Sequence, residues 1–376
     1  MRTRKSPPNQ RNSMFLAVRD IRFAKGRFAL MGSVVALITL LLVMLSGLTA
    51  GLGDQSTSAI SALPAQQIAF GAPAGGEAKA SYTESEVSNK QLEAWRNRPG
   101  VASVEAVGIT QTRFQSLDSS NNAAGTANVA VFGADGGISP VAVRDGEVVV
   151  GEALAKELAL STGSSVTVGG TSLTVYAVTQ DEWYSHTGVV WTSRATWQKL
   201  AHIPAGESIG TVLAVTYDAG ASVDPDAANA AAGTVSATPS GSFQALGSYK
   251  SENGSLMLMQ AFLYGISALV IVAFLTVWTV QRTRDIAVLK AMGASSGYVV
   301  RDALVQAGIV LLAGAGLGGG VGVVGGFFAA KAAPFLVTPL TTLVPIAGIV
   351  ILGLGGAAMA VRSITKVDPL IALGGN

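Results

Sequence analysis

The sequence offers few side chains that could ligate a metal or carry out catalysis. It has no cysteine and only two histidines, His186 and His202. A disulfide or thiolate site is therefore impossible, and a multi-histidine metal site is nearly excluded. The chain also lacks the G-x-x-x-x-G-K-[ST] phosphate loop, so it does not bind ATP by that motif. We expect no intrinsic cofactor, no metal site and no enzyme activity.

The most informative polar stretch is Gln281 to Gly297, QRTRDIAVLKAMGASSG, which separates two long apolar runs. Its start is charged, and Ile286 to Met292 has the pattern of an amphipathic helix. Gly293 follows where a helix C-cap favours glycine. The stretch is too polar to cross a bilayer and too short to be a domain. We expect a short helix beneath the membrane, suited to being pushed by another protein.

The elements that position this stretch belong to a membrane protein. Only 13% of the 376 residues are charged and the mean hydropathy is +0.46, whereas soluble domains carry about 25% charged residues. Four apolar runs are long enough to cross a bilayer. We predict four transmembrane α-helices with a large external α+β domain inserted between the first and the second.

Lysine and arginine give the orientation, because cytosolic segments beside the spans carry an excess of them. Residues 1–27, 281–302 and 362–376 hold 14 of the 25 basic residues and only four acids, whereas residues 52–254 hold ten basic and nineteen acidic residues. Both termini are therefore predicted to be cytosolic. A cleaved signal peptide is the alternative for the first run, but that run is longer than such a peptide needs.

The predicted boundaries follow from the apolar runs and the charge pattern. They are a basic cytosolic N-terminus with an amphipathic helix (1–27), the first span (28–51), the external domain with its stalks (52–254), the second span (255–280), the cytosolic helix loop (281–298), the third span (299–330), a short external loop (331–341), the fourth span (342–361) and the cytosolic tail (362–376).

Residues 52–254 alternate short apolar runs with turn signals, which predicts an α+β fold. The predicted strands are 129–133, 147–151, 165–168, 173–178, 188–191 and 212–217, with a helix at 152–160 and a helical stalk over 55–61. Residues 71–76 and 117–128 have the composition of loops, and 219–241 fits either a helix or a linker.

The third apolar run carries glycines four residues apart, and they fall on one face of a helix. They are Gly314, Gly318, Gly322 and Gly326. Small residues at this spacing let helix backbones approach closely in lipid. Dense packing within one subunit and a seam that moves both remain open. No span has an ionisable residue in its middle, which disfavours an ion-coupled transporter. The energy should therefore come from outside the chain.

Two motifs resemble the MacB/FtsX-like permease family of ABC transporters. Residues 284–294, RDIAVLKAMGA, are similar to the family's E-I-(G/A)-x-x-(R/K)-A-x-G-A stretch, with Asp285 in place of the usual glutamate. Residues 367–373, VDPLIAL, are similar to its V-D-P-x-x-A-L tail. The region 149–170 resembles its external core, and the segments 14–22 and 45–52 resemble the DevC/HrtB branch, which includes haem exporters.

The resemblance implies a homodimeric permease in the plasma membrane, with its large domain extracellular. It further implies two copies of a cytosolic ABC ATPase that bind ATP and Mg, contact with membrane lipid, and no nucleic acid partner. Residues 284–294 would form the coupling helix that sits in a groove of the ATPase. When the ATPase closes on ATP, it would push this helix, and the stalks of the external domain would carry that movement outward. The residues expected to contact the ATPase are Arg284, Asp285, Ile286, Leu289, Lys290, Met292, Gly293 and Ala294.

The resemblance makes haem or a similar amphiphile the expected cargo, which would need an apolar slot and axial ligands. The candidate residues are Met257, Met259, Phe262, Tyr264, Tyr249, Met31, Met44 and His186. Ordinary packing is the alternative for each of them. Two other functions stay open, namely an FtsX-like permease that regulates a cell-wall hydrolase, and lipoprotein extraction.

Overall fold

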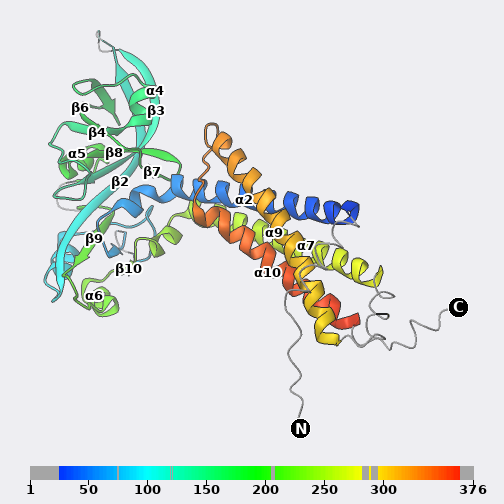
Figure 1. Ribbon diagram of the computed structural model, residues 1–376. Coiled ribbons are helices and arrows are strands. Elements are labelled where there is room, and N and C mark those ends of the chain that lie inside the picture. The colour runs from blue at the N-terminus through cyan, green and yellow to red at the C-terminus, as the bar shows by residue number, and fades with distance from the viewer. Residues whose placement is uncertain are drawn as a thin grey trace. The chain divides into compact units, whose positions relative to one another are not determined.

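The computed structural model describes residues 25–73, 76–118, 120, 122–204, 208–281, 288 and 295–364. The chain separates into two compact units. We call residues 1–51 with 255–376 the helical unit, and Leu52–Gly254 the α+β domain. Figure 1 shows the long helices and the sheet that distinguish the two.

Four helices among the described residues are long and apolar enough to cross a membrane. They are α2 (Lys25–Ala62), α7 (Gly247–Gln281), α9 (Ser296–Ala329) and α10 (Pro339–Ile364). Helix α2 has 38 residues and α7 has 35. At 1.5 Å per residue each is over 50 Å long, and a bilayer core is only about 30 Å thick. Both helices therefore continue well beyond one crossing, and residues 55–61, which were predicted to be helical, lie within α2.

The other two membrane helices begin at hydroxyl caps. The Tyr298 amide donates to Ser295 Oγ (3.2 Å) at the start of α9, and the Thr341 amide donates to Thr338 Oγ1 (3.1 Å) at the start of α10. Such side chains satisfy amides that the first turn leaves unpaired. The helices consequently start before the apolar runs do.

One apolar cluster holds the helical unit together, and all four long helices contribute to it. Its most buried members are Val35 and Leu42 of α2, Ile271 and Leu275 of α7, Leu311 and Ala315 of α9, and Ile349 and Ala357 of α10. The helices thus form one bundle.

The α+β domain is built on a ten-stranded sheet in which β2 (Val101–Leu117) is central. The first half of β2 pairs with β9 (Val212–Tyr217), which leads through β1 (Gln67–Phe70) to the edge strand β10 (Val235–Ala237). Helices α3 (Asn89–Arg96) and α6 (Pro225–Ala232) pack with this part.

The second half of β2 closes a ring of six strands. It pairs with β3 on one side and with β5 on the other, and β8, β4 and β6 complete the circuit. These strands are β3 (Ala123–Ala134), β4 (Glu147–Gly151), β5 (Ser165–Val168), β6 (Thr171–Thr179) and β8 (Thr187–Thr192). Every strand of the ring contributes to one buried cluster, with Phe114, Val131, Val148, Val166, Val175 and Val190. The ring is therefore a small barrel with its own core.

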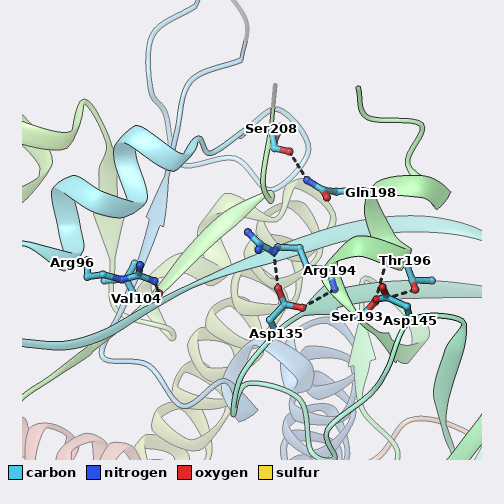
Figure 2. Close-up of polar contacts among 9 residues, drawn as sticks. All are labelled: Arg96, Val104, Asp135, Asp145, Ser193, Arg194, Thr196, Gln198 and Ser208. Carbon is cyan, nitrogen blue, oxygen red and sulfur yellow. Dashed lines mark hydrogen bonds and ion pairs between the residues drawn. The ribbon is translucent and has the colours of Figure 1, made fainter. Parts of the chain in front are cut away.

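Helix α5 (Arg194–Leu200) closes over this barrel. Ser193 caps it by accepting from the Thr196 amide (3.1 Å), and its hydroxyl donates to Asp145 (2.5 Å), while Arg194 pairs with Asp135 (2.8 Å), as Figure 2 shows. Trp197 of α5 lies against Gly108 and Gly133, where a Cβ would collide with its side chain. The contacts of Ser193 and Arg194 therefore hold α5 in place on the barrel.

The six predicted strands of this domain are confirmed, since each lies within β3, β4, β5, β6, β8 or β9. The predicted loop at 117–128 is wrong. Residues 123–128 belong to β3 and pair in register with β2, with Phe114 opposite Ala127 and Ser116 opposite Gly125. Pairing along a long neighbour outweighs the weak strand preference of alanine, glycine and asparagine.

Two further predictions need correction. The helix predicted over 152–160 is α4 (Glu152–Glu157), which ends early because Ala159 has a positive φ of 51°. The ambiguous stretch 219–241 contains both α6 and β10. Asp224 caps α6 by accepting from the Asp226 amide (3.0 Å), and Gly233 ends it in the left-handed conformation.

Candidate functional site

The predicted coupling segment, Arg284 to Ala294, lies outside the described residues except for Val288, which is helical. Helix α7 ends at Gln281 and α9 begins at Ser296. The segment is therefore the connection between two membrane helices. All eight residues expected to contact the ATPase fall in the part of the chain that is not described, so their role stays a prediction.

The glycine face of α9 lies directly against α2 of the same chain. A Cβ on Gly314 would lie 2.8 Å from the carbonyl oxygen of Gly32, and one on Gly322 would lie 2.8 Å from Val43 Cγ1. At Gly318 a Cβ would collide with the Ala36 carbonyl. Gly326 instead faces Phe335 and Val337, in the connection that follows α9. Close backbone packing within one chain accounts for this spacing.

The candidate ligands in the helical unit do not converge. Met257, Met259 and Phe262 are exposed on α7, whereas Met31 is buried in the bundle core. Tyr264 fills the space beside Gly348 of α10, and Met44 lies next to Gly325 of α9. Met259 and Phe262 are three residues apart and lie on the same side of α7, whereas Met257, two residues before Met259, lies on a different side.

The two candidate ligands in the α+β domain already have partners. Tyr249 stacks edge-on against Phe243, with ring centres 5.6 Å apart. His186 Nε2 lies 2.9 Å from Glu252 Oε2 and 3.1 Å from Ser56 Oγ. Among the described residues, no three His, Asp or Glu side chains gather closely enough to hold a metal ion.

A cavity of about 280 Å³ opens beside His186 in the same domain. Acidic and aromatic side chains line it, including Glu157, Asp181, Glu182 and Trp183. Asp181 accepts from the Ala153 amide (2.8 Å) and Glu182 accepts from Trp191 Nε1 (2.7 Å). Burial raises the pKa of Glu182, and the bond from Trp191 only partly opposes this shift. Both carboxylates are thus engaged in holding the fold.

Sequence reasoning missed two polar groupings. Ser56 contacts His186 and Ser248 contacts the neighbouring Ser185, but nothing in their separate positions along the chain brings these residues together. The second grouping is Asp302 with Gln306. It could have been predicted from the sequence, because residues four apart share a helix face. Gln306 is fully buried in α9 and donates to Asp302 (2.9 Å).

Two family models match the chain, one over each of two successive regions. Residues 28–235 match the MacB-like periplasmic core domain, and residues 257–369 match the FtsX-like permease C-terminal domain. The second match includes the segment between α7 and α9.

Curated relatives align over almost the whole chain. The hemin transport system permease protein HrtB of Staphylococcus epidermidis is 22% identical over 363 residues, which cover 96% of this chain and 99% of HrtB. An uncharacterized ABC transporter permease of Mycobacterium bovis is 22% identical, with the same coverage of both chains. Among solved structures, the periplasmic region of MacB from Actinobacillus actinomycetemcomitans has a TM-score of 0.35 and 9% identity, over 48% of this chain and 92% of that one.

In the described part of the chain, four helices apolar enough to cross a membrane, with a large folded domain between the first two, indicate a plasma membrane permease with an external domain. The match over residues 28–235 covers more than half of the chain. The chain belongs to the MacB-like family of ABC transporter permeases, and its residues 257–369 form the FtsX-like permease C-terminal domain. The resemblance drawn from its loop and tail motifs is confirmed, and so is the predicted fold class.

Proposed function

We propose that this chain is the permease subunit of a MacB-type ABC exporter that removes hemin or a similar amphiphile from the membrane. The observation that carries the proposal is the alignment with HrtB, a hemin transport system permease by name, over 96% of one chain and 99% of the other. An alignment of that extent includes the membrane helices as well as the external domain.

The proposed mechanism is mechanical transmission driven by a separate ABC ATPase. Two copies of the ATPase would bind ATP and Mg, and two copies of this chain would pair. Both termini and the segment Arg284 to Ala294 would lie in the cytosol, where the segment would contact the ATPase. Helix α2 supports this mechanism, because it is continuous from Lys25 to Ala62 and can carry a displacement along its length.

The proposed entry site for the cargo is the exposed surface of α7 at Met259 and Phe262, with Met257 exposed on another side of the same helix. Thioether sulfurs are known axial ligands of haem iron, and an aromatic ring can lie against the macrocycle. A surface reached from the lipid suits a molecule that partitions into the membrane. Tyr264, Tyr249, Met31, Met44 and His186 are less suitable, since each already packs or bonds within its own unit.

Hemin binding tests the cargo directly. Purified full-length protein in nanodiscs is titrated with hemin, and we expect a shift of the Soret band. The shift should be lost in a Met257→Ala, Met259→Ala double variant. The control is Met359→Ala, an exposed methionine on α10. No spectral change in the wild type, with normal hemin tolerance of a deletion strain, would contradict hemin as cargo and favour an FtsX-like signalling permease or lipoprotein extraction.

Coupling is tested in the segment that joins α7 and α9. We expect Asp285→Asn or Gly293→Leu to lower hemin export at least tenfold while the complex still assembles and hydrolyses ATP. Gly297→Leu is the matched control, because among the described residues no atom outside its own turn of helix lies within 4 Å of a Cβ at that position. Wild-type export in both coupling variants would refute the role proposed for the segment.

A further inference from the structure

The hairpin of β7 (Trp183–Tyr184) and β8 is hydrogen-bonded to the C-terminal end of α2, within the α+β domain. At its tip, the Ser185 amide donates to the Ser56 carbonyl (3.0 Å) and the His186 amide donates to the Gln55 carbonyl (2.9 Å). The Trp183 amide donates to Ser58 Oγ (2.8 Å). Three amides of one short hairpin thus bond to one turn of α2.

The same hairpin tip contacts the beginning of α7. Ser185 Oγ lies 2.9 Å from Ser248 Oγ, and His186 Nε2 lies 2.9 Å from Glu252 Oε2. That nitrogen also lies 3.1 Å from Ser56 Oγ on α2. One imidazole nitrogen carries either a single hydrogen or a single lone pair. The two helices therefore compete for His186.

The chemistry of these contacts differs from that of the contacts one turn further along α2. There, Ala59 and Ile60 are fully buried in the domain core with Leu246, which precedes α7. The side chains of His186 and Glu252 are 36% and 31% exposed. Water can replace a half-exposed polar contact at little net cost, whereas the apolar contacts stay closed. The contact between the hairpin and the two helices thus has a buried apolar part that stays closed and a polar part whose hydrogen bonds water can replace.

The backbone at the hairpin tip is strained. Ser185 and His186 have φ angles of 48° and 63°, a conformation that two-residue hairpins usually assign to Asn-Gly. Neither residue is glycine, so the surrounding contacts must hold the turn in place. Strained backbone of this kind gathers at switch regions and clamps, and opening the turn would relieve it.

We propose that the β7–β8 hairpin is a releasable clasp on α2 and α7, and that His186 is its positioning residue. The clasp is closed when the hairpin tip contacts both helices, with His186 bonded to either Ser56 or Glu252, and it opens when the two helices move apart. Its place in a transport cycle rests on the proposed function. The clasp itself depends only on contacts within the α+β domain.

Amide hydrogen exchange on the full-length protein in nanodiscs tests the clasp without any transport assay. Exchange of the Ser185 and His186 amides reports their bonds to α2. In His186→Ala we expect up to about tenfold faster exchange at the amides of residues 185 and 186, because the side-chain contacts with Ser56 and Glu252 are lost. His202→Ala is the matched control, since His202 also has a positive φ (55°) in this domain. Equal exchange in the two variants would overturn the role of His186.

A cross-link tests whether release is needed. The chain has no cysteine, so Ser185→Cys with Ser248→Cys creates a single bridge across the 2.9 Å hydroxyl contact. In the complex with its ATPase, we expect oxidation to lower ATP-driven export at least tenfold and reduction to restore it. Ser161→Cys with Ser164→Cys is the control, because that hydroxyl pair (3.4 Å) touches neither helix.

The outcomes separate the clasp from the proposed function. Full export by the oxidised 185–248 pair would mean that the hairpin stays shut throughout the cycle, and would overturn release. No ATP-driven export by the wild type, combined with faster exchange in His186→Ala, would refute the exporter and support the clasp as a joint.

Discussion

The α2–α9 contact in the helical unit and the hairpin contact in the α+β domain join helices by opposite means. In the first, glycines bring two backbones together, and a Cβ on Gly314 would lie only 2.8 Å from the Gly32 carbonyl oxygen. In the second, serine, histidine and glutamate side chains meet across half-exposed hydrogen bonds.

The difference follows from the solvent around each contact. Lipid offers no hydrophobic drive between helices, so close van der Waals packing must hold them, and small residues allow it. Such packing has few alternative arrangements. At a water-exposed hairpin, each lost hydrogen bond can be replaced by one to water. We therefore expect the α2–α9 pair to move as one body and the hairpin to be where the structure yields.

The largest effect should come from filling the glycine face. Gly318→Leu would drive a side chain into the Ala36 carbonyl. Ordinary overpacking costs about 1–3 kcal/mol of stability, and we expect this substitution to cost well over that. We expect little or no folded protein in the membrane fraction. Gly320→Leu is the control on the same helix, because no atom of the described residues outside its own turn of helix lies within 4 Å of a Cβ there. Wild-type amounts of the Gly318→Leu variant would mean that α2 and α9 can separate, and would contradict the expectation that they move as one body.

A smaller effect is expected from a cavity in the barrel of the α+β domain. Phe114 is fully buried, so Phe114→Ala should cost about 3–5 kcal/mol. Thermal unfolding followed by both near-UV and far-UV circular dichroism should show the aromatic signal of the α+β domain melting earlier while the far-UV helical signal persists. Tyr176→Ala, which removes an aromatic ring that is 42% exposed on β6, should change little. A single transition that shifts as a whole would show that the two units unfold together.

Local patterns were sufficient to predict much of this fold. Hydropathy and charge gave four helices, and alternation gave the strands that contribute Val131, Val148, Val166 and Val190 to the barrel core. The motifs at 284–294 and 367–373 pointed to the family that the comparisons then showed. Each of these signals lies within a short window, so no knowledge of distant contacts was needed.

Contacts between distant segments could not be predicted. Strand β2 runs for 17 residues because β9, β3 and β5 pair with different parts of it. The sequence of β2 alone does not predict a strand of that length. His186 resembled a free ligand because Ser56 and Glu252 lie 130 and 66 residues away. The α3 cap was readable, since Ser88 and Gln91 form a capping box.

The smallest effect concerns Glu182, beside the hairpin. Burial raises its pKa above the ordinary 4.5, so the folded state holds the proton more tightly than the unfolded state does. Stability is therefore lost as the pH rises from about 4.5 through the raised pKa, and at neutral pH the ionised carboxylate costs free energy. Glu182→Gln removes that cost and keeps an oxygen for Trp191 Nε1, now 2.7 Å away.

We expect Glu182→Gln to raise the melting temperature of the α+β domain by about 1 °C at pH 7, a small value because the carboxyl is only partly buried. The gain should vanish below about pH 4, where glutamate is neutral in both states. Glu157→Gln, at the rim of the same cavity, should show no such gain. A lower melting temperature for Glu182→Gln at pH 7 would mean that the ionised carboxylate stabilises the hairpin, and that charge as well as hydrogen bonding holds this region closed.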